Sequence, residues 1–261
     1  MDKIKAISKD KIIEIAVEKN FNPNLILKDY YLTIMLYLLK DVKGIYFKGG
    51  TALQKTILDY SRISEDIDLT VTLDMKKIKK EIIEILTNTN LFEKITKDKD
   101  VEGFTRLIFH YKTIDDKEDK VLIDLNARAK LSKKPERHKM QHFYQENIPE
   151  FTFNTLAFEE IIAEKMAATI GRNKPRDHYD LYKILKAKLP INLGLVKKKC
   201  KESRTEFNII KMFNQANKLK SRWDEDLMPL LSEEISFKEV IRTLAKHFKL
   251  KEEKEKLKKK N

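Results

Sequence analysis

The chain has 261 residues, of which 41% are apolar and 36% are charged, so it can bury the core of one large or two small domains. Six Gly and six Pro are too few for a loop-rich all-β protein, and long Lys/Glu/Ile/Leu stretches indicate many helices and a smaller sheet. The net charge of +13 attracts phosphates, but a Lys-rich proteome would give the same value, so it permits a nucleic-acid partner without establishing one.

No run approaches the roughly 18 apolar residues of a membrane span. Residues 1–10 are charged and contain no signal-peptide core. We therefore expect a cytoplasmic protein with no membrane partner. The single cysteine, Cys200, cannot form an internal disulfide, and neither it nor the five His has the spacing of a zinc site.

The first part of the chain alternates helical and strand patterns. Apolar spacing predicts helices over residues 3–19, 24–40, 51–58 and 75–87. Period-2 or β-branched runs predict strands over residues 44–48, 64–72, 104–111 and 120–128. These patterns favour a small mixed sheet with flanking helices.

From about residue 155 the pattern is helical only. Helices are expected over residues 157–170, 177–187, 194–218 and 236–248, followed by a Lys-rich tail that is helical or frayed. We therefore expect an α+β fold with two domains. Residues 1–150 would form the α/β domain with N-terminal helices, and residues 151–261 a helical domain.

Three acidic residues on predicted strands are candidates for metal binding. Asp66 and Asp68 are two residues apart on one strand, so their side chains share a face, where they repel each other unless a cation lies between them. Oxygen ligands of this kind suit Mg²⁺, or Mn²⁺. Asp124 lies in the otherwise apolar strand 121–125 and either completes that site or belongs to the polar face of a half-exposed strand.

A glycine turn precedes the acidic pair. Gly49 and Gly50 join a predicted strand to a helix, an arrangement in which backbone N–H groups and the helix N-terminus can bind phosphate. Thr51 can cap that helix or donate its hydroxyl to phosphate, and the same residues also suit an ordinary tight turn. Neither a P-loop nor a GxGxxG motif is present.

Together these motifs resemble the AbiEii/AbiGii-type nucleotidyltransferase toxins of the polymerase-β-like superfamily. The resemblance lies in FKGGTAL (47–53), RISEDIDL (62–69), FEEIIAEK (158–165) and RDHYDLY (176–182), and it spans roughly residues 44–186. It implies a toxin of a bacterial toxin–antitoxin or abortive-infection system that uses a nucleoside triphosphate. It also implies a separate antitoxin encoded nearby and, for some members, transfer to the acceptor end of tRNA.

The resemblance also implies site residues. The catalytic carboxylates would be Asp66 and Asp68, the downstream lysine Lys165, and the last acidic motif Asp177 and Asp180. Around them we expect a nucleotide-binding set made of Lys48, Gly49, Gly50, Thr51, Arg62, Ser64, Lys165 and Arg176.

Helical spacing places Asp177 and Asp180 beside a core-facing stripe, where they need partners such as Lys165 or Arg176. Alternatively, Asp177 caps its helix and Asp180 pairs with Lys183 in solvent.

The sequence thus predicts a Mg²⁺-dependent nucleotidyltransferase in which Asp66, Asp68 and Asp124 bind the metal. A tRNA 3′ end is the first candidate for the acceptor. Two alternatives remain open: transfer of the nucleotide to a protein hydroxyl, and a non-catalytic basic module that binds nucleic acid or the antitoxin.

Overall fold

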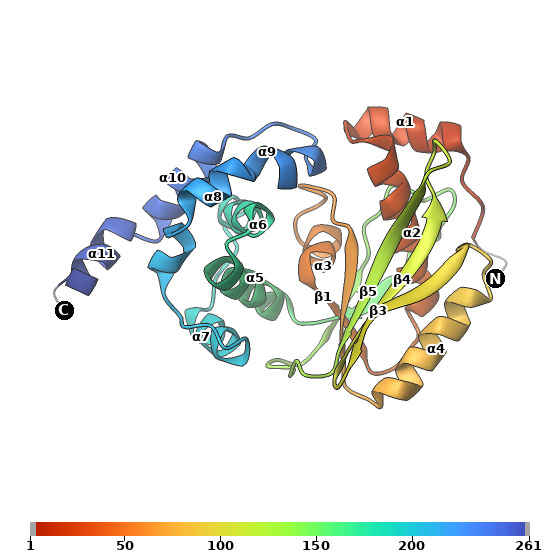
Figure 1. Ribbon diagram of the computed structural model, residues 1–261, viewed down its shortest axis with the longest axis horizontal. Coiled ribbons are helices and arrows are strands. Elements are labelled where there is room, and N and C mark those ends of the chain that lie inside the picture. The colour runs from red at the N-terminus through yellow and green to blue at the C-terminus, as the bar shows by residue number, and fades with distance from the viewer. Residues whose placement is uncertain (1–3, 259–261) are drawn as a thin grey trace. The chain divides into compact units, whose positions relative to one another are not determined.

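The computed structural model describes residues 4–258, and the chain separates into two compact units. Unit 1 extends to Phe158 and holds a mixed β-sheet with helices, whereas unit 2 begins at Glu159 and is helical (Figure 1). The expected α+β organisation is therefore confirmed. Among the described residues, no helix combines the length and apolar character that a membrane span requires.

Unit 1 begins with two helices and then alternates strands with further helices. Its helices are α1 (Lys9–Lys19), α2 (Pro23–Leu39), α3 (Gly49–Thr56) and α4 (Met75–Thr87). Its strands are β1 (Ile45–Lys48), β2 (Asp66–Val71), β3 (Lys94–Val101), β4 (Phe104–Lys112), β5 (Glu118–Asn126), β6 (Glu136–Lys139) and β7 (Thr152–Thr155). The Asn22-Pro23 pair both separates α1 from α2 and starts α2, because Asn22 accepts a hydrogen bond as its N-cap.

The strands form one mixed sheet in the order β3-β4-β5-β2-β1-β7-β6. Strands β2 and β5 are parallel, as are β1 and β7, and the other neighbours are antiparallel. The central register pairs Lys48 with Asp68 and Asp68 with Asp124. Directly paired residues on neighbouring strands point to the same side of a sheet, so this register aligns these three side chains.

The two faces of the sheet differ in polarity. Phe47, Leu69 and Leu125 are paired across β1, β2 and β5 and are fully buried. Helix α2 covers this apolar face: the ring of its Tyr31 lies 4.4 Å from that of Tyr111, which is buried on β4. The opposite face carries the half-buried charged residues of β1, β2, β4 and β5.

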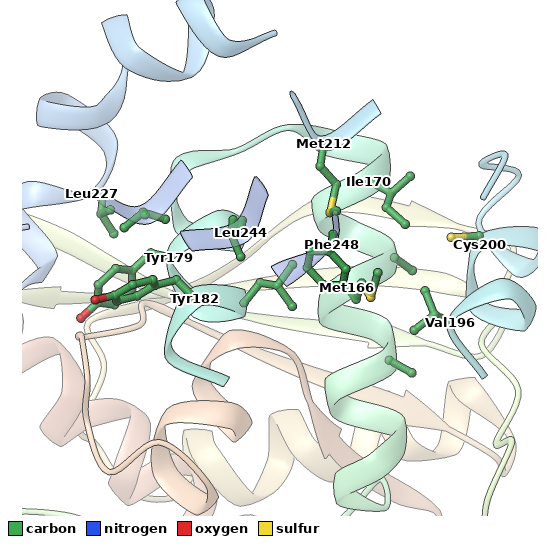
Figure 2. Packing of buried hydrophobic residues seen from close by; sticks show 14 of the residues in the cluster. Met166, Ile170, Tyr179, Tyr182, Val196, Cys200, Met212, Leu227, Leu244 and Phe248 are labelled. Atoms are coloured by element: carbon green, nitrogen blue, oxygen red, sulfur yellow. The ribbon is translucent and has the colours of Figure 1, made fainter. Parts of the chain in front are cut away.

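Unit 2 is built from short helices around its own apolar core. Its α-helices are α5 (Phe158–Arg172), α6 (Pro175–Lys186), α7 (Leu193–Glu202), α8 (Ala216–Ser221), α9 (Trp223–Asp226), α10 (Phe237–His247) and α11 (Leu250–Lys258), and its 3₁₀ helices are η1 (Ile209–Phe213) and η2 (Met228–Leu230). Met166 and Ile170 of α5 pack with residues of α6, α7 and α10 in this core (Figure 2). Trp223 is buried there, as expected for a packing residue, and donates its Nε1–H to the carbonyl of Ile235 at 3.0 Å.

A buried polar network fastens α3 to α2. Lys55 of α3 is 1% exposed and forms a 2.8 Å ion pair with Asp29 of α2. The Lys55 ammonium also donates to the hydroxyls of Thr33 and Tyr60. Tyr60 and Tyr144 donate to Asp29 Oδ2 at 2.9 and 3.1 Å. Burial, and then the charge of Asp29, raise the pKa of both tyrosines, so both phenols stay protonated and act as donors.

The structure departs from the sequence prediction at charged or irregular segments. Strand β3 was not predicted, because its Lys and Asp residues lack apolar alternation and it lies at the edge of the sheet. Strands β6 and β7 were also missed. The helix expected over residues 194–218 ends at Glu202, because Arg204 adopts a left-handed conformation with φ of 55°. The Lys-rich tail is helical over Leu250–Lys258, and residues 259–261 of that prediction lie outside the described residues.

We predict that Lys55→Met lowers the free energy of unfolding by about 3–5 kcal/mol, because it leaves the buried carboxylate of Asp29 without its cation. The double variant Lys55→Met/Asp29→Leu should be markedly more stable than Lys55→Met. Without Asp29, Tyr60 and Tyr144 still have the carbonyls of Gln141 and Ile26 as acceptors at 3.1 and 2.8 Å. Urea unfolding of the three proteins measures this. Equal losses in the single and double variants would contradict the prediction.

His142 should make stability depend on pH. Burial, and then the nearby charge of Lys55, lower the pKa of His142 from 6.5 to about 4. Below pH 6.5 the unfolded chain binds a proton that the folded chain excludes, so stability falls as the pH drops toward 4. Between pH 7 and pH 5 this group should lower the free energy of unfolding by about 2 kcal/mol. His142→Asn should remove this contribution in urea titrations, whereas His247→Asn on the exposed end of α10 should not.

Candidate active site

The glycine turn between β1 and α3 lies directly on a carboxylate of β2. Gly49 has a positive φ of 77°, a conformation that disfavours residues with a side chain. A Cβ atom at this position would lie only 2.8 Å from Cγ of Asp68. The backbone of the turn and the Asp68 side chain are therefore in van der Waals contact. Lys48, the residue before the turn, is the register partner of Asp68 on β1.

Gly50 brings the same turn against two polar side chains. A Cβ atom there would lie 2.9 Å from Nη2 of Arg62 and 3.0 Å from the hydroxyl oxygen of Ser64. The N-cap of α3 is Lys48, whose side chain makes no capping hydrogen bond in the described structure. The Lys48 side chain therefore does not occupy the N-terminus of α3, a position at which helices bind anions.

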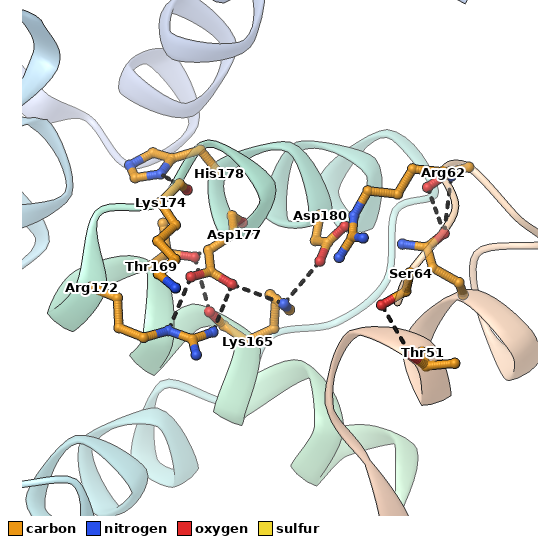
Figure 3. A network of polar contacts seen from close by, with 12 residues as sticks. Thr51, Arg62, Ser64, Lys165, Thr169, Arg172, Lys174, Asp177, His178 and Asp180 are labelled. Carbon is orange, nitrogen blue, oxygen red and sulfur yellow. Dashed lines mark hydrogen bonds and ion pairs between the residues drawn. The ribbon is translucent and has the colours of Figure 1, made fainter. Parts of the chain in front are cut away.

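Buried polar residues of α3 hold the segment that leads into β2. The Thr51 hydroxyl is hydrogen-bonded to that of Ser64 at 2.9 Å (Figure 3). It also donates to the carbonyl of Asp66. Gln54 Oε1 accepts from the hydroxyl of Ser61 and the backbone N–H of Arg62 at 2.9 and 3.3 Å. The suggestion that Thr51 caps the helix is wrong, because the N-cap of α3 is Lys48 and Thr51 lies within the helix. Its role in nucleotide binding stays a prediction.

The three predicted metal ligands lie on one face of the sheet. Asp66 and Asp68 alternate with buried Ile67 and Leu69 on β2. Asp124 of β5 is directly paired with Asp68. The two carboxylates of β2 are half-buried and have the oxygen chemistry that Mg²⁺ prefers, so they suit a divalent ion.

Asp124 already has a cationic partner, Arg106 of β4. The guanidinium donates from Nε to Oδ1 and from Nη2 to Oδ2 of Asp124, both at 2.7 Å. The hydrogen bonds that Arg106 donates to Asp124 raise the pKa of Arg106, and the charges of Asp124 and Asp66 add to the effect. No group of three or more His, Cys, Asp or Glu side chains within residues 4–258 is arranged to hold a metal ion. The assignment of Asp124 to the metal therefore stays a prediction.

Sequence reasoning missed Arg106, although a signal for it was present. Strands β4 and β5 form a hairpin, and the register begins with Lys112 paired to Glu118 across the turn at residues 113–117. Counting back from this turn places Arg106 opposite Asp124. The two strands were recognised, but the turn was not used to fix their register.

In unit 2, Lys165 lies between two buried acids. Its ammonium is 3.0 Å from Asp177 Oδ1 and 2.8 Å from Asp180 Oδ2 (Figure 3). Arg172 also donates to Asp177, at 2.9 and 3.2 Å. Burial raises the pKa of Asp177, but the charges of Lys165 and Arg172 outweigh it and lower that pKa below its ordinary value.

These contacts decide between the alternatives for the acidic pair. Asp177 is not a helix cap, since the N-cap of α6 is Lys174. Asp180 is fully buried and paired with Lys165, so the alternative of a solvent pair with Lys183 is wrong. The second cation on Asp177 is Arg172, whereas Arg176 is half-buried on α6. Catalytic or nucleotide-binding roles for these residues stay predictions.

Similar folds occur in solved structures, two of which are described as nucleotidyltransferases. MenT4, a nucleotidyltransferase toxin from Mycobacterium tuberculosis, aligns with a TM-score of 0.62 and 18% identity, covering 92% of this chain and 99% of its own. A putative nucleotidyltransferase from Helicobacter pylori gives 0.60 and 21%, with the same coverage. JHP933 from Helicobacter pylori gives 0.56 and 18%, covering 91% of this chain and 98% of its own. At such identities the likeness establishes the fold.

Comparison with curated protein sequences gives no significant match. The family model described as nucleotidyl transferase AbiEii toxin, type IV toxin–antitoxin system, matches residues 36–247. That match includes the glycine turn, all three sheet carboxylates and the Lys165 cluster. The chain therefore belongs to the AbiEii family of nucleotidyltransferase toxins of type IV toxin–antitoxin systems.

Proposed function

We propose that this nucleotidyltransferase toxin transfers a nucleotide from a nucleoside triphosphate to an RNA acceptor in a reaction that depends on Mg²⁺ or Mn²⁺. A tRNA 3′ end is the first candidate for the acceptor. The observation that carries the proposal is the contact between the Gly49 backbone and the carboxylate of Asp68. A triphosphate on the turn and a cation on the carboxylate would meet at this point, as nucleotidyl transfer requires.

In this proposal, separate groups of the chain bind the triphosphate and the metal ion. The N–H groups at Gly50 and Thr51 would bind the triphosphate, with Lys48, Arg62 and Ser64 as further contacts. Asp66 and Asp68 would hold the metal, which would promote attack by the acceptor hydroxyl and neutralise pyrophosphate. The acceptor oxygen forms a bond to the α-phosphorus, the bond to the β-phosphate oxygen breaks, and the hydroxyl proton passes to water. Pyrophosphate then leaves.

We extend the proposal to the buried cluster of unit 2. The resemblance assigns catalytic roles to Lys165, Asp177 and Asp180 and nucleotide binding to Lys165 and Arg176. The two carboxylates on Lys165 hold its ammonium in one fixed orientation, which supports a role in which Lys165 donates a hydrogen bond to a phosphate oxygen.

The acceptor and protein partners follow from charge and from the family. A net charge of +13 supports an acceptor rich in phosphates, such as tRNA. Family membership supports a cognate antitoxin, and we propose that a neighbouring gene encodes it and that both proteins are cytoplasmic. The adjacent open reading frame is the direct place to look for it.

Incubation of the protein with each labelled nucleoside triphosphate, Mg²⁺ and either total RNA or protein extract tests the reaction. We expect label in RNA of tRNA size, at its 3′ end, because the proposed site binds a triphosphate next to metal-binding carboxylates. Label in protein would instead support transfer to a protein hydroxyl. No label together with tight RNA binding would support the non-catalytic module.

Asp68→Asn and Asp66→Asn should each lower labelling by at least about 10²-fold, because each removes a charged oxygen ligand. The matched control is Asp116→Asn in the exposed β4–β5 turn, which should retain full activity; circular dichroism checks folding. Full labelling by the Asp68→Asn protein would show that the reaction does not need the Asp66–Asp68 pair.

Gly49→Ala should lower the labelling rate about 10- to 100-fold. The added Cβ would press on Asp68, and alanine disfavours the positive φ of the turn, so the turn must shift. Gly194→Ala is the control, since a Cβ there would meet only Asn192 Oδ1, at 3.2 Å, and the position lies in α7. Initial rates over a range of triphosphate concentrations measure the effect. An unchanged rate for Gly49→Ala would show that the contact with Asp68 is not needed.

A further inference from the structure

Four charged residues form a row across four neighbouring strands. The register pairs Lys48 with Asp68, Asp68 with Asp124, and Asp124 with Arg106, so the order of charges is cation, anion, anion, cation. All four side chains point to the same face of the sheet. The two carboxylates in the middle repel each other, and each has a cationic residue as its other cross-strand neighbour.

The Arg106–Asp124 pair has the strongest geometry that these two groups can adopt. Both carboxylate oxygens accept from the guanidinium at 2.7 Å in a bidentate arrangement. The pair is partly sheltered, with 30% of the Arg106 side chain and 14% of the Asp124 side chain exposed. Asp98 lies 3.7 Å from Nη1 of Arg106 and restrains the guanidinium from the side of β3. The contact is therefore better defined than an ordinary surface ion pair.

This pairing affects how Asp124 can meet a metal ion. Both of its oxygens already face a fixed cation, and the guanidinium would repel a divalent ion placed beside them. A second metal ion in such a site would neutralise the third carboxylate, but here the chain itself supplies that positive charge. Asp66 and Asp68 remain the two metal-binding carboxylates of the proposed site.

We propose that Arg106 is a positioning residue that neutralises Asp124 in place of a second metal ion, so that the chain binds one divalent ion, on Asp66 and Asp68. This inference rests on the proposed function, since it concerns the same site. Asp124 then acts through its neighbours: with Arg106 it fixes the charge next to Asp68 and is not itself a metal ligand.

Mn²⁺ binding to the full-length protein tests the inference without relying on activity. Electron paramagnetic resonance of free Mn²⁺ gives the number of bound ions and their Kd. We expect one Mn²⁺ per chain for the native protein and for Arg106→Gln/Asp124→Asn, with Kd values within about two-fold of each other, because removing the pair together takes away no ligand and leaves the net charge beside Asp68 unchanged. Asp68→Asn should weaken binding by at least about 10-fold.

Two Arg106 variants sharpen the test. Arg106→Gln should allow a second Mn²⁺ to bind, because Asp124 loses its cation. The Arg106→Lys protein keeps the positive charge but loses the bidentate guanidinium, and it should still bind one ion. Because both residues are partly exposed, these changes leave the core intact, and circular dichroism with thermal unfolding verifies it.

The outcomes separate this inference from the proposed function. Two ions on the native protein, or loss of Mn²⁺ binding in Arg106→Gln/Asp124→Asn to the degree seen in Asp68→Asn, would overturn the inference alone. Absence of Mn²⁺ binding by the native protein would overturn the metal site of the proposed function and the inference with it. Labelling of RNA that persists in Asp68→Asn would do the same.

Discussion

The contact between the backbone of Gly49 and the carboxylate of Asp68 is the constraint around which the sheet site is organised. It requires a residue without a side chain at a positive φ, and it brings the N-terminus of α3 onto the polar face of β2. The antiparallel register of β1 and β2 pairs Lys48 with Asp68, so the turn that follows Lys48 lies beside this carboxylate. Thr51 then fixes the angle of α3 through its bonds to Ser64 and Asp66.

Helix α3 can hold this position because it is anchored at both ends by buried polar groups. Thr51 fastens its first turn to the segment before β2, and Lys55 fastens its last turn to α2 through Asp29. An eight-residue helix is too short to be stable by itself, so tertiary contacts must supply its rigidity. The buried Lys55–Asp29 pair fixes the position of α3 more than it raises the net stability. The cost of removing both charges from water offsets much of their attraction.

Buried lysines recur in this basic chain. Lys55, Lys165 and Lys199 are 1%, 6% and 4% exposed, and each pairs with acids on a neighbouring helix. Their ammonium groups lie between neighbouring helices. The net charge of +13 already subtracts the acids that these lysines pair with, so their burial does not reduce the positive charge available at the surface.

The sequence by itself determined the α+β class, most helices, the central strands and the family, because apolar periodicity and the GGTAL and SEDIDL strings are local features. It also placed Asp66 and Asp68 on one face. Edge strand β3, the partner of Asp124 and the burial of Lys55 could not be read locally, since a charged side chain looks the same in sequence whether it is solvated or paired. Tertiary structure decided these points: strand register brought Arg106 to Asp124, and helix packing brought Lys55 to Asp29, over separations of 18 and 26 residues along the chain.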